Sequence, residues 1–130
     1  MMDAKTKRYV RKRAGHRCEY CQLHQDQSPL VPLQTEHVIP KKHGGTDTED
    51  NLALACIDCN LAKSSNLTGI DPETGRVTVL FHPRTQVWAD HFERRGLLIL
   101  GRTDVGRTTM RVLNMNSDEQ IELRDVLRSK

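Results

Sequence analysis

Residues 36–45 read EHVIPKKHGG, and this short stretch decides how the rest of the sequence is interpreted. Glu36 and His37 are adjacent, and each can bind a metal or transfer a proton. QTEHVI at residues 34–39 favours a short strand, which the proline and paired glycines after it end in a basic loop. Neighbouring strand residues point to opposite faces, but this alternation relaxes near a strand end. We therefore expect both side chains to turn toward one cleft.

Two cysteine pairs flank this stretch with the spacing C-x2-C, thirty-four residues, C-x2-C. Two such turns, which we call zinc knuckles, supply the four thiolates of a tetrahedral metal site. Zinc is the usual metal, although iron in a rubredoxin-like site has the same ligand count. Four protein ligands leave no position for water, so the predicted site is structural. Its ligands are Cys18, Cys21, Cys56 and Cys59.

Further polar residues lie between the knuckles and just after the second one. His43 and Asn51 fall between them, and Asn60 and Lys63 come after the second. Because Asn60 and Lys63 are three positions apart, they share one face of the helix expected to begin there. The cysteine site would hold that face against the strand that carries Glu36.

The length of 130 residues fits one domain, predicted here as a core at about residues 16–66 and an extension at about 67–130. Only 4% of residues are aromatic, and small cores often need a metal or disulfide. The net charge is +3, but residues 5–17 hold seven Lys or Arg and no acid. Such a cluster attracts nucleic acid, or it is simply the solvated face of a helix.

No run approaches the roughly 20 apolar residues that span a bilayer. The first residues also lack the apolar segment of a signal peptide. We therefore expect a cytoplasmic protein with no membrane partner. Disulfides are rare in that compartment, which favours metal binding by the cysteines.

Outside the core, the pattern predicts helices at residues 4–16 and 85–95, and strands at 76–81 and 96–101. In the first of these strands Val77, Val79 and Phe81 alternate. Two more helices are expected at 104–116 and 117–130, the second starting with a capping box from Ser117 and Gln120.

Taken together, EHVIPKKHGG, NLALAC and CNLAK resemble the HNH endonucleases, and specifically the HNN variant with two zinc knuckles. The resemblance implies an α+β fold with a ββα-metal core. A four-cysteine zinc site would staple this core, with a basic helix before it and an α/β extension after it. All of residues 1–130 would form a single nuclease domain.

The resemblance also implies roles for individual residues. His37 would be the general base, since a histidine is a competent base at neutral pH. Glu36 and Asn60 would bind the catalytic cation. Asn51 would orient His37 or tie down the loop, and Lys63 would contact a phosphate.

The last letter of the motif is Asn60, where the prototype has histidine. Glu36 and Asn60 together offer only oxygen ligands, which suit Mg²⁺ or Mn²⁺ better than Zn²⁺. The sequence thus predicts two kinds of metal site, zinc on sulfur and magnesium or manganese on oxygen.

The leading hypothesis is a metal-dependent DNA endonuclease that nicks one strand per site, as a monomer or a homodimer. A non-catalytic zinc-knuckle module that binds nucleic acid is the alternative, and a zinc-stapled protein-interaction domain is a third. The residues expected to contact nucleic acid are Lys63, His43, Lys41, Lys42, Arg11 and Arg13.

Overall fold

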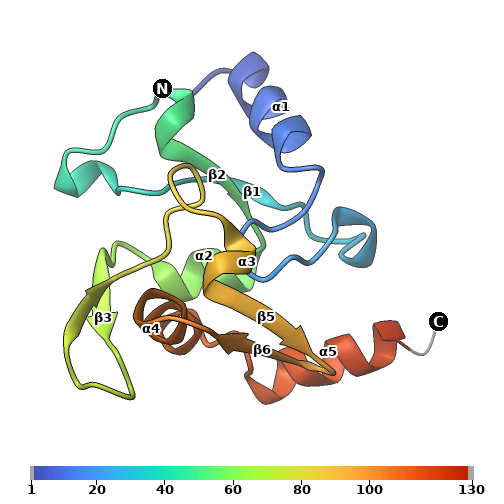
Figure 1. Ribbon diagram of the computed structural model, residues 1–130. Coiled ribbons are helices and arrows are strands. Elements are labelled where there is room, and N and C mark those ends of the chain that lie inside the picture. Colours follow the sequence, from blue (N-terminus) through green and yellow to red (C-terminus); the bar gives the residue numbers. More distant parts are fainter. Residues whose placement is uncertain (1, 129–130) are drawn as a thin grey trace.

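The computed structural model describes residues 2–128 and has a mixed α+β architecture (Figure 1). Short 3₁₀ helices at Gln25–Gln27, Lys41–His43 and Glu49–Asn51 supplement the regular elements. No helix within the described residues is both long enough and apolar enough to cross a membrane. The helices and strands are α1 (Ala4–Arg13), β1 (Gln34–His37), β2 (Leu52–Ala55), α2 (Ile57–Lys63), β3 (Thr68–Ile70), β4 (Val77–Val79), α3 (Trp88–His91), β5 (Phe92–Arg95), β6 (Leu98–Gly101), α4 (Asp104–Val112) and α5 (Asp118–Arg128).

The centre of the molecule is the antiparallel hairpin β1–β2, with α2 directly after it. Glu36 pairs with Ala53 and His37 with Leu52 across the hairpin. All four residues of β2 are buried, because two helices cover the hairpin. Helix α1 contacts both strands, and α2 contacts β1. A strand covered on both sides has no polar face, which explains the continuous apolar run LALA. This hairpin and helix form the predicted ββα core.

The basic helix α1 is capped at its N-terminus and packs on the core through one buried apolar residue. Asp3 caps it by accepting a hydrogen bond from the Thr6 amide at 2.8 Å, and Val10 is its buried residue. Basic residues fill its last turn, where positive charge suits the helix dipole. The helix ends at Arg13, three residues before the predicted end at residue 16.

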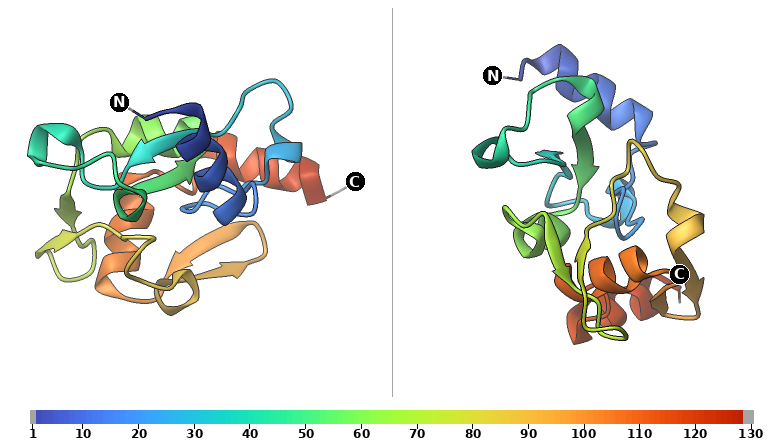
Figure 2. Two further views of the ribbon diagram at one scale, coloured as in Figure 1. Left: turned by 90° about the horizontal axis from the view of Figure 1, so that it is seen from above. Right: turned by 60° about the vertical axis from the view of Figure 1, so that its left-hand side comes forward.

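The C-terminal extension contains two further hairpins, β3–β4 and β5–β6, that pack with α4 (Figure 2). Glycines allow α4 to approach closely: a Cβ on Gly106 would lie 1.9 Å from the His91 carbonyl oxygen, and one on Gly101 would lie 2.3 Å from the Arg107 nitrogen. Only glycine fits at this crossing.

The extension shares a single hydrophobic core with the ββα unit. The Phe81 ring meets Tyr20 edge-on at 6.4 Å and Phe92 at 5.2 Å. Trp88 Nε1 donates to the Tyr20 carbonyl oxygen at 2.7 Å, and Arg84 pairs with Glu19. The extension therefore packs on the first knuckle, which carries Glu19 and Tyr20.

Two sequence predictions for the extension were wrong in detail. The strand predicted at 76–81 is only β4, in which Val77 and Val79 are exposed and Thr78 is buried, because the face of this two-stranded hairpin that meets α4 carries Thr78. The helix predicted at 85–95 is only α3, after which the chain turns into strand β5. Pairing with β6 takes precedence there over the helical spacing of Trp88 and Phe92, whose rings stack at 5.1 Å.

The last two helices form, with different ends. Helix α4 stops at Val112, and α5 is described only to Arg128, so residues 129–130 of its prediction lie outside the described part. Ser117 Oγ accepts from the Gln120 amide at 3.2 Å, as a cap should. Gln120 does not complete the capping box, because its side chain donates to Asp58 Oδ2 at 2.6 Å. This bond instead joins α5 to α2.

Candidate active site and metal centre

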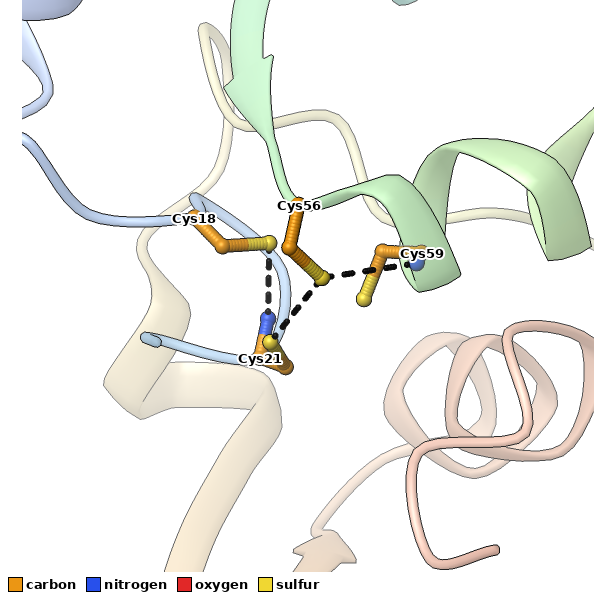
Figure 3. Close-up of side chains that lie close together, drawn as sticks. All are labelled: Cys18, Cys21, Cys56 and Cys59. Atoms are coloured by element: carbon orange, nitrogen blue, oxygen red, sulfur yellow. Dashed lines mark hydrogen bonds between the residues drawn. The ribbon is translucent and has the colours of Figure 1, made fainter. Parts of the chain in front are cut away.

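The four cysteines converge into one buried cluster (Figure 3). Their sulfur atoms all lie within 4.8 Å of one another, and Cys21 Sγ is 3.6 Å from Cys56 Sγ. Tetrahedral zinc with Zn–S bonds of about 2.3 Å separates sulfurs by about 3.8 Å. The cluster therefore has the ligand number and spacing of a structural zinc site.

Each cysteine pair sits on a tight backbone turn. The amide of Cys21 donates to Cys18 Sγ at 3.4 Å, and the amide of Cys59 donates to Cys56 Sγ at 3.4 Å. Cys56 is the N-cap of α2, so the cluster fixes the start of that helix. The link between Cys18–Cys21 and Cys56–Cys59 holds the helix beside the hairpin.

The four thiols cannot all ionise independently. Hydrogen bonds from the other cysteines lower the pKa of Cys56, whereas contact with Cys18 and burial raise the pKa of Cys21 and of Cys59. A bound dication would stabilise all four thiolates together. The donor set thus fits zinc well.

Glu36 and Lys63 form a buried ion pair between β1 and α2. Lys63 Nζ lies 3.3 Å from Glu36 Oε1 and donates to the Val38 and His37 carbonyl oxygens at 2.8 and 3.2 Å. Lys63 is only 2% exposed. All three ammonium protons have partners, so this lysine stabilises the end of β1, and the phosphate contact by Lys63 stays a prediction.

The Glu36 carboxylate has a second fixed partner and one oxygen to spare. Tyr20 Oη donates to Oε1 at 2.9 Å. Burial raises the pKa of Tyr20, and the Glu36 charge raises it further, so the phenol stays a neutral donor. Burial also raises the pKa of Glu36, although Lys63 and Tyr20 oppose this. Oε2 is buried and has no hydrogen-bond partner among the described residues.

Asn60 lies on the same interface as Glu36. Its Nδ2 donates to Gln34 Oε1 at 2.8 Å. Gln34 and Glu36 are two apart on β1, and Asn60 and Lys63 are three apart on α2, so these bonds join one strand face to one helix face. Glu36 and Asn60 therefore lie diagonally across this interface. The unpartnered carboxylate oxygen of Glu36 and the amide oxygen of Asn60 are both hard oxygen donors, the kind that Mg²⁺ or Mn²⁺ prefers.

His37 bonds to the loop after β1. Its Nε2 lies 2.6 Å from Asp47 Oδ1, and Lys41 Nζ lies 3.1 Å from Asp47 Oδ2. Hydrogen bonds from His37 and Lys41, of which the one from His37 has the larger effect, lower the pKa of Asp47 well below its usual range. With Nε2–H donating to this carboxylate, Nδ1 is the ring nitrogen left to accept a proton. We expected Glu36 and His37 to turn toward one cleft. In the structure they contact different elements: Glu36 contacts α2, and His37 contacts the loop.

Asn51 holds the loop of residues 38–51 closed. Its Nδ2 donates to the carbonyl oxygens of Ile39 and Thr46 at 3.0 and 2.9 Å, and its Oδ1 accepts from the Ile39 amide at 2.9 Å. A Cβ on Gly45 would lie 1.7 Å from the Ile39 oxygen, so the loop can close this tightly only with glycine there. Of its two proposed roles, Asn51 performs the second, tying down the loop.

The basic residues predicted to contact nucleic acid divide into two groups. Arg11 donates to Gln25 Oε1 and the Leu33 oxygen, and Arg13 donates to the Glu49 and Leu52 oxygens. Both guanidinium groups thus tie α1 to the core, and their role in nucleic-acid binding stays a prediction. The remaining three, Lys41, Lys42 and His43, are exposed on the loop, with Lys41 paired to Asp47 and His43 bonded to the Ser65 oxygen at 3.1 Å.

Three partners of the site residues were not predicted from the sequence. Tyr20 bonds Glu36, Gln34 bonds Asn60, and Asp47 bonds His37. Gln34 could have been found, because it is two positions from Glu36 and therefore on its strand face. Nothing in the local pattern distinguishes Tyr20 or Asp47 from other knuckle and loop residues.

Comparison with known protein families agrees with this geometry. Residues 18–66 match the family model described as HNH endonuclease. Searches of curated proteins and of solved structures gave no match.

Residues 18–66 are thus an HNH endonuclease domain, with a ββα core and a buried four-cysteine cluster typical of the zinc site in such domains. The match over these residues points to nuclease activity, with nucleic acid as the class of substrate.

Proposed function

We propose that the protein is a metal-dependent DNA endonuclease in which His37 is the general base. The observation that carries this is the hydrogen bond between His37 and Asp47, 2.6 Å long, at the end of the HNH hairpin. A carboxylate that accepts from one ring nitrogen fixes the tautomer and orientation of the imidazole. The other nitrogen can then take a proton from the attacking water.

The remaining residues of the site position this base and one cation. Asn51 closes the loop that carries Asp47, and Lys63 fixes the strand end through the His37 and Val38 carbonyl groups. Glu36 and Asn60 would hold Mg²⁺ or Mn²⁺ through oxygen atoms. When bound, such a cation neutralises charge that develops on the leaving oxygen. The cysteine cluster would hold zinc and keep α2 beside the hairpin.

One such site addresses one phosphodiester at a time, so we expect single-strand nicks. Purified zinc-loaded protein would be incubated with supercoiled plasmid, with Mg²⁺, with Mn²⁺ and with no added divalent cation. Nicked circles should accumulate before linear molecules, and only with a cation present.

Absence of cleavage in every condition, with the protein folded and still bound to DNA, would contradict the proposal. It would favour the non-catalytic nucleic-acid-binding module instead.

A further inference from the structure

A cavity of about 350 Å³ lies among α5, the first knuckle and β5. Among the described residues that line it, every charged side chain is an arginine. We call it the arginine pocket. Its four arginines are Arg17, Arg94, Arg124 and Arg128.

Arg124 is the fixed member of this pocket. It is 8% exposed, and it donates to the Leu97 carbonyl oxygen, to Asn116 Oδ1 and to the Met115 carbonyl oxygen. Burial lowers the pKa of Arg124, and the nearby positive charge of Arg94 lowers it further, whereas the thiols oppose both. Arg128 is one helical turn along α5, on the same face.

The other three guanidinium groups are exposed at the surface. Arg17 donates to the Gln22 carbonyl oxygen, and Arg128 pairs with Asp125 in an exposed contact 2.9 Å long. Exposed pairs of this kind are weak, so these side chains can exchange partners at little cost.

The zinc site beside the pocket does not cancel its charge. Cys21 forms part of the lining, and four thiolates with one Zn²⁺ would carry two negative charges in total. Four guanidinium groups exceed this by two positive charges, or by one when the Asp125 carboxylate paired with Arg128 is counted. The pocket would therefore still attract an anion with the zinc site loaded.

We propose that the arginine pocket binds a backbone phosphate of the nucleic acid, away from the phosphodiester that is cut. Guanidinium groups match phosphate oxygens with paired hydrogen bonds, and arginine is favoured over lysine where such geometry matters. The choice of a nucleic acid as the anion rests on the proposed function, which already brings phosphodiesters to this small molecule.

The position of the pocket suits a flanking contact. The loop after β1 and helix α5 lie at opposite ends of the molecule in Figure 1 and in the left view of Figure 2. A globular chain of this length has a radius of gyration of about 14 Å, so opposite sides of the folded molecule are separated by roughly 40 Å. That span is close to one helical turn of duplex DNA, about 34 Å. One duplex could reach both regions.

The test is the affinity for a labelled DNA duplex of the double variant Arg94→Gln/Arg128→Gln, measured by fluorescence anisotropy. Zinc-loaded protein is used without Mg²⁺ or Mn²⁺, so binding is read without cleavage. The matched control is Arg102→Gln/Arg111→Gln, which removes the same charge from two exposed arginines that do not line the pocket. Unfolding midpoints and zinc content are compared for all proteins.

Each lost phosphate contact should reduce the slope of log K against log salt by about 0.9. The pocket variant should therefore bind at least about tenfold more weakly at about 0.1 M salt, with a slope shallower by about 0.9 for the one phosphate that is lost. The control should stay within about twofold of the wild type. Lysine at both pocket positions should retain most of the slope but lose part of the affinity.

Equal loss of affinity in the pocket variant and the control would overturn the proposal, since only net charge would then matter. So would unchanged affinity in the pocket variant. Because binding is measured without cleavage, these outcomes remain separate from failure of the nuclease proposal.

Discussion

Replacing Lys63 with methionine tests the structural ion pair of this lysine against its predicted phosphate contact. Methionine keeps most of the aliphatic stem but removes the ammonium group that faces Glu36 at 3.3 Å. It also leaves the Val38 and His37 carbonyl oxygens without their donor. The carboxylate would then be a buried charge without a counterion.

Breaking a buried ion pair in this way costs about 3–5 kcal/mol. Domains of this size are stable by about 5–15 kcal/mol, so the variant should unfold at markedly lower urea concentration. Its thermal unfolding midpoint should fall by roughly 10–20 °C. Because burial raises the pKa of Glu36, protonation of the carboxyl removes the unpaired charge as pH falls. The deficit of Lys63→Met relative to the wild type should therefore shrink between about pH 7 and pH 4.

Urea unfolding of zinc-loaded protein provides the assay, with two further variants for comparison. Lys42→Met changes an exposed loop lysine in the same way and should stay within about 0.5 kcal/mol of the wild type. Adding Glu36→Gln to Lys63→Met removes the orphaned charge and should recover much of the loss. A Lys63→Met protein as stable as Lys42→Met would refute the buried ion pair and favour the phosphate contact.

Three further predictions concern the site and the extension. Asp47→Asn should lower the cleavage rate about 100-fold with little change in DNA affinity, because the imidazole loses its carboxylate partner; single-turnover rates and anisotropy measure the two effects. Asp71 is buried and accepts two hydrogen bonds from Arg107, which lower the pKa of its carboxyl group. The pair therefore stabilises the fold above about pH 4, and this stabilisation is lost as pH falls further. Asp71→Asn should therefore be less stable at neutral pH, and its deficit relative to the wild type should shrink as pH falls below about 4, as measured by urea unfolding. A strong chelator that removes zinc should unfold the protein, since binding of structural zinc contributes about 10–16 kcal/mol to the free energy of folding. The fluorescence of Trp88 would report this unfolding, because its ring nitrogen donates to the Tyr20 carbonyl oxygen in the first knuckle.

The core of the fold could be predicted because its signals are local. The cysteine spacing, the apolar run LALA and the glycine pair each specify a short segment, and the structure places those segments as expected. The extension was harder, because its short hairpins depend on packing with α4 and not on their own patterns. Trp88 and Phe92 have helical spacing, yet the chain after α3 is a strand because it pairs with β6.

The sequence predicted which residues belong to the site, but not which of these residues contact one another. Lys63 and Asn60 do share a helix face, but which of them meets Glu36 depends on the depth at which α2 packs against β1. Lys63 is buried there, and Asn60 meets Gln34. The same limit applies to Arg11 and Arg13, because charge alone does not distinguish a guanidinium that binds phosphate from one that binds backbone carbonyl groups.

The most direct test of His37 as the general base compares cleavage by His37→Asn with cleavage by His16→Asn under single-turnover conditions, in Mg²⁺ or Mn²⁺. His16 is exposed and has a positive φ of 59°, a conformation that asparagine tolerates, so its variant is a matched control. We predict that His37→Asn loses about 10²–10⁴-fold in rate while His16→Asn keeps the wild-type rate. Equal rates for the two variants, with both folded and zinc-loaded, would show that His37 is not the general base.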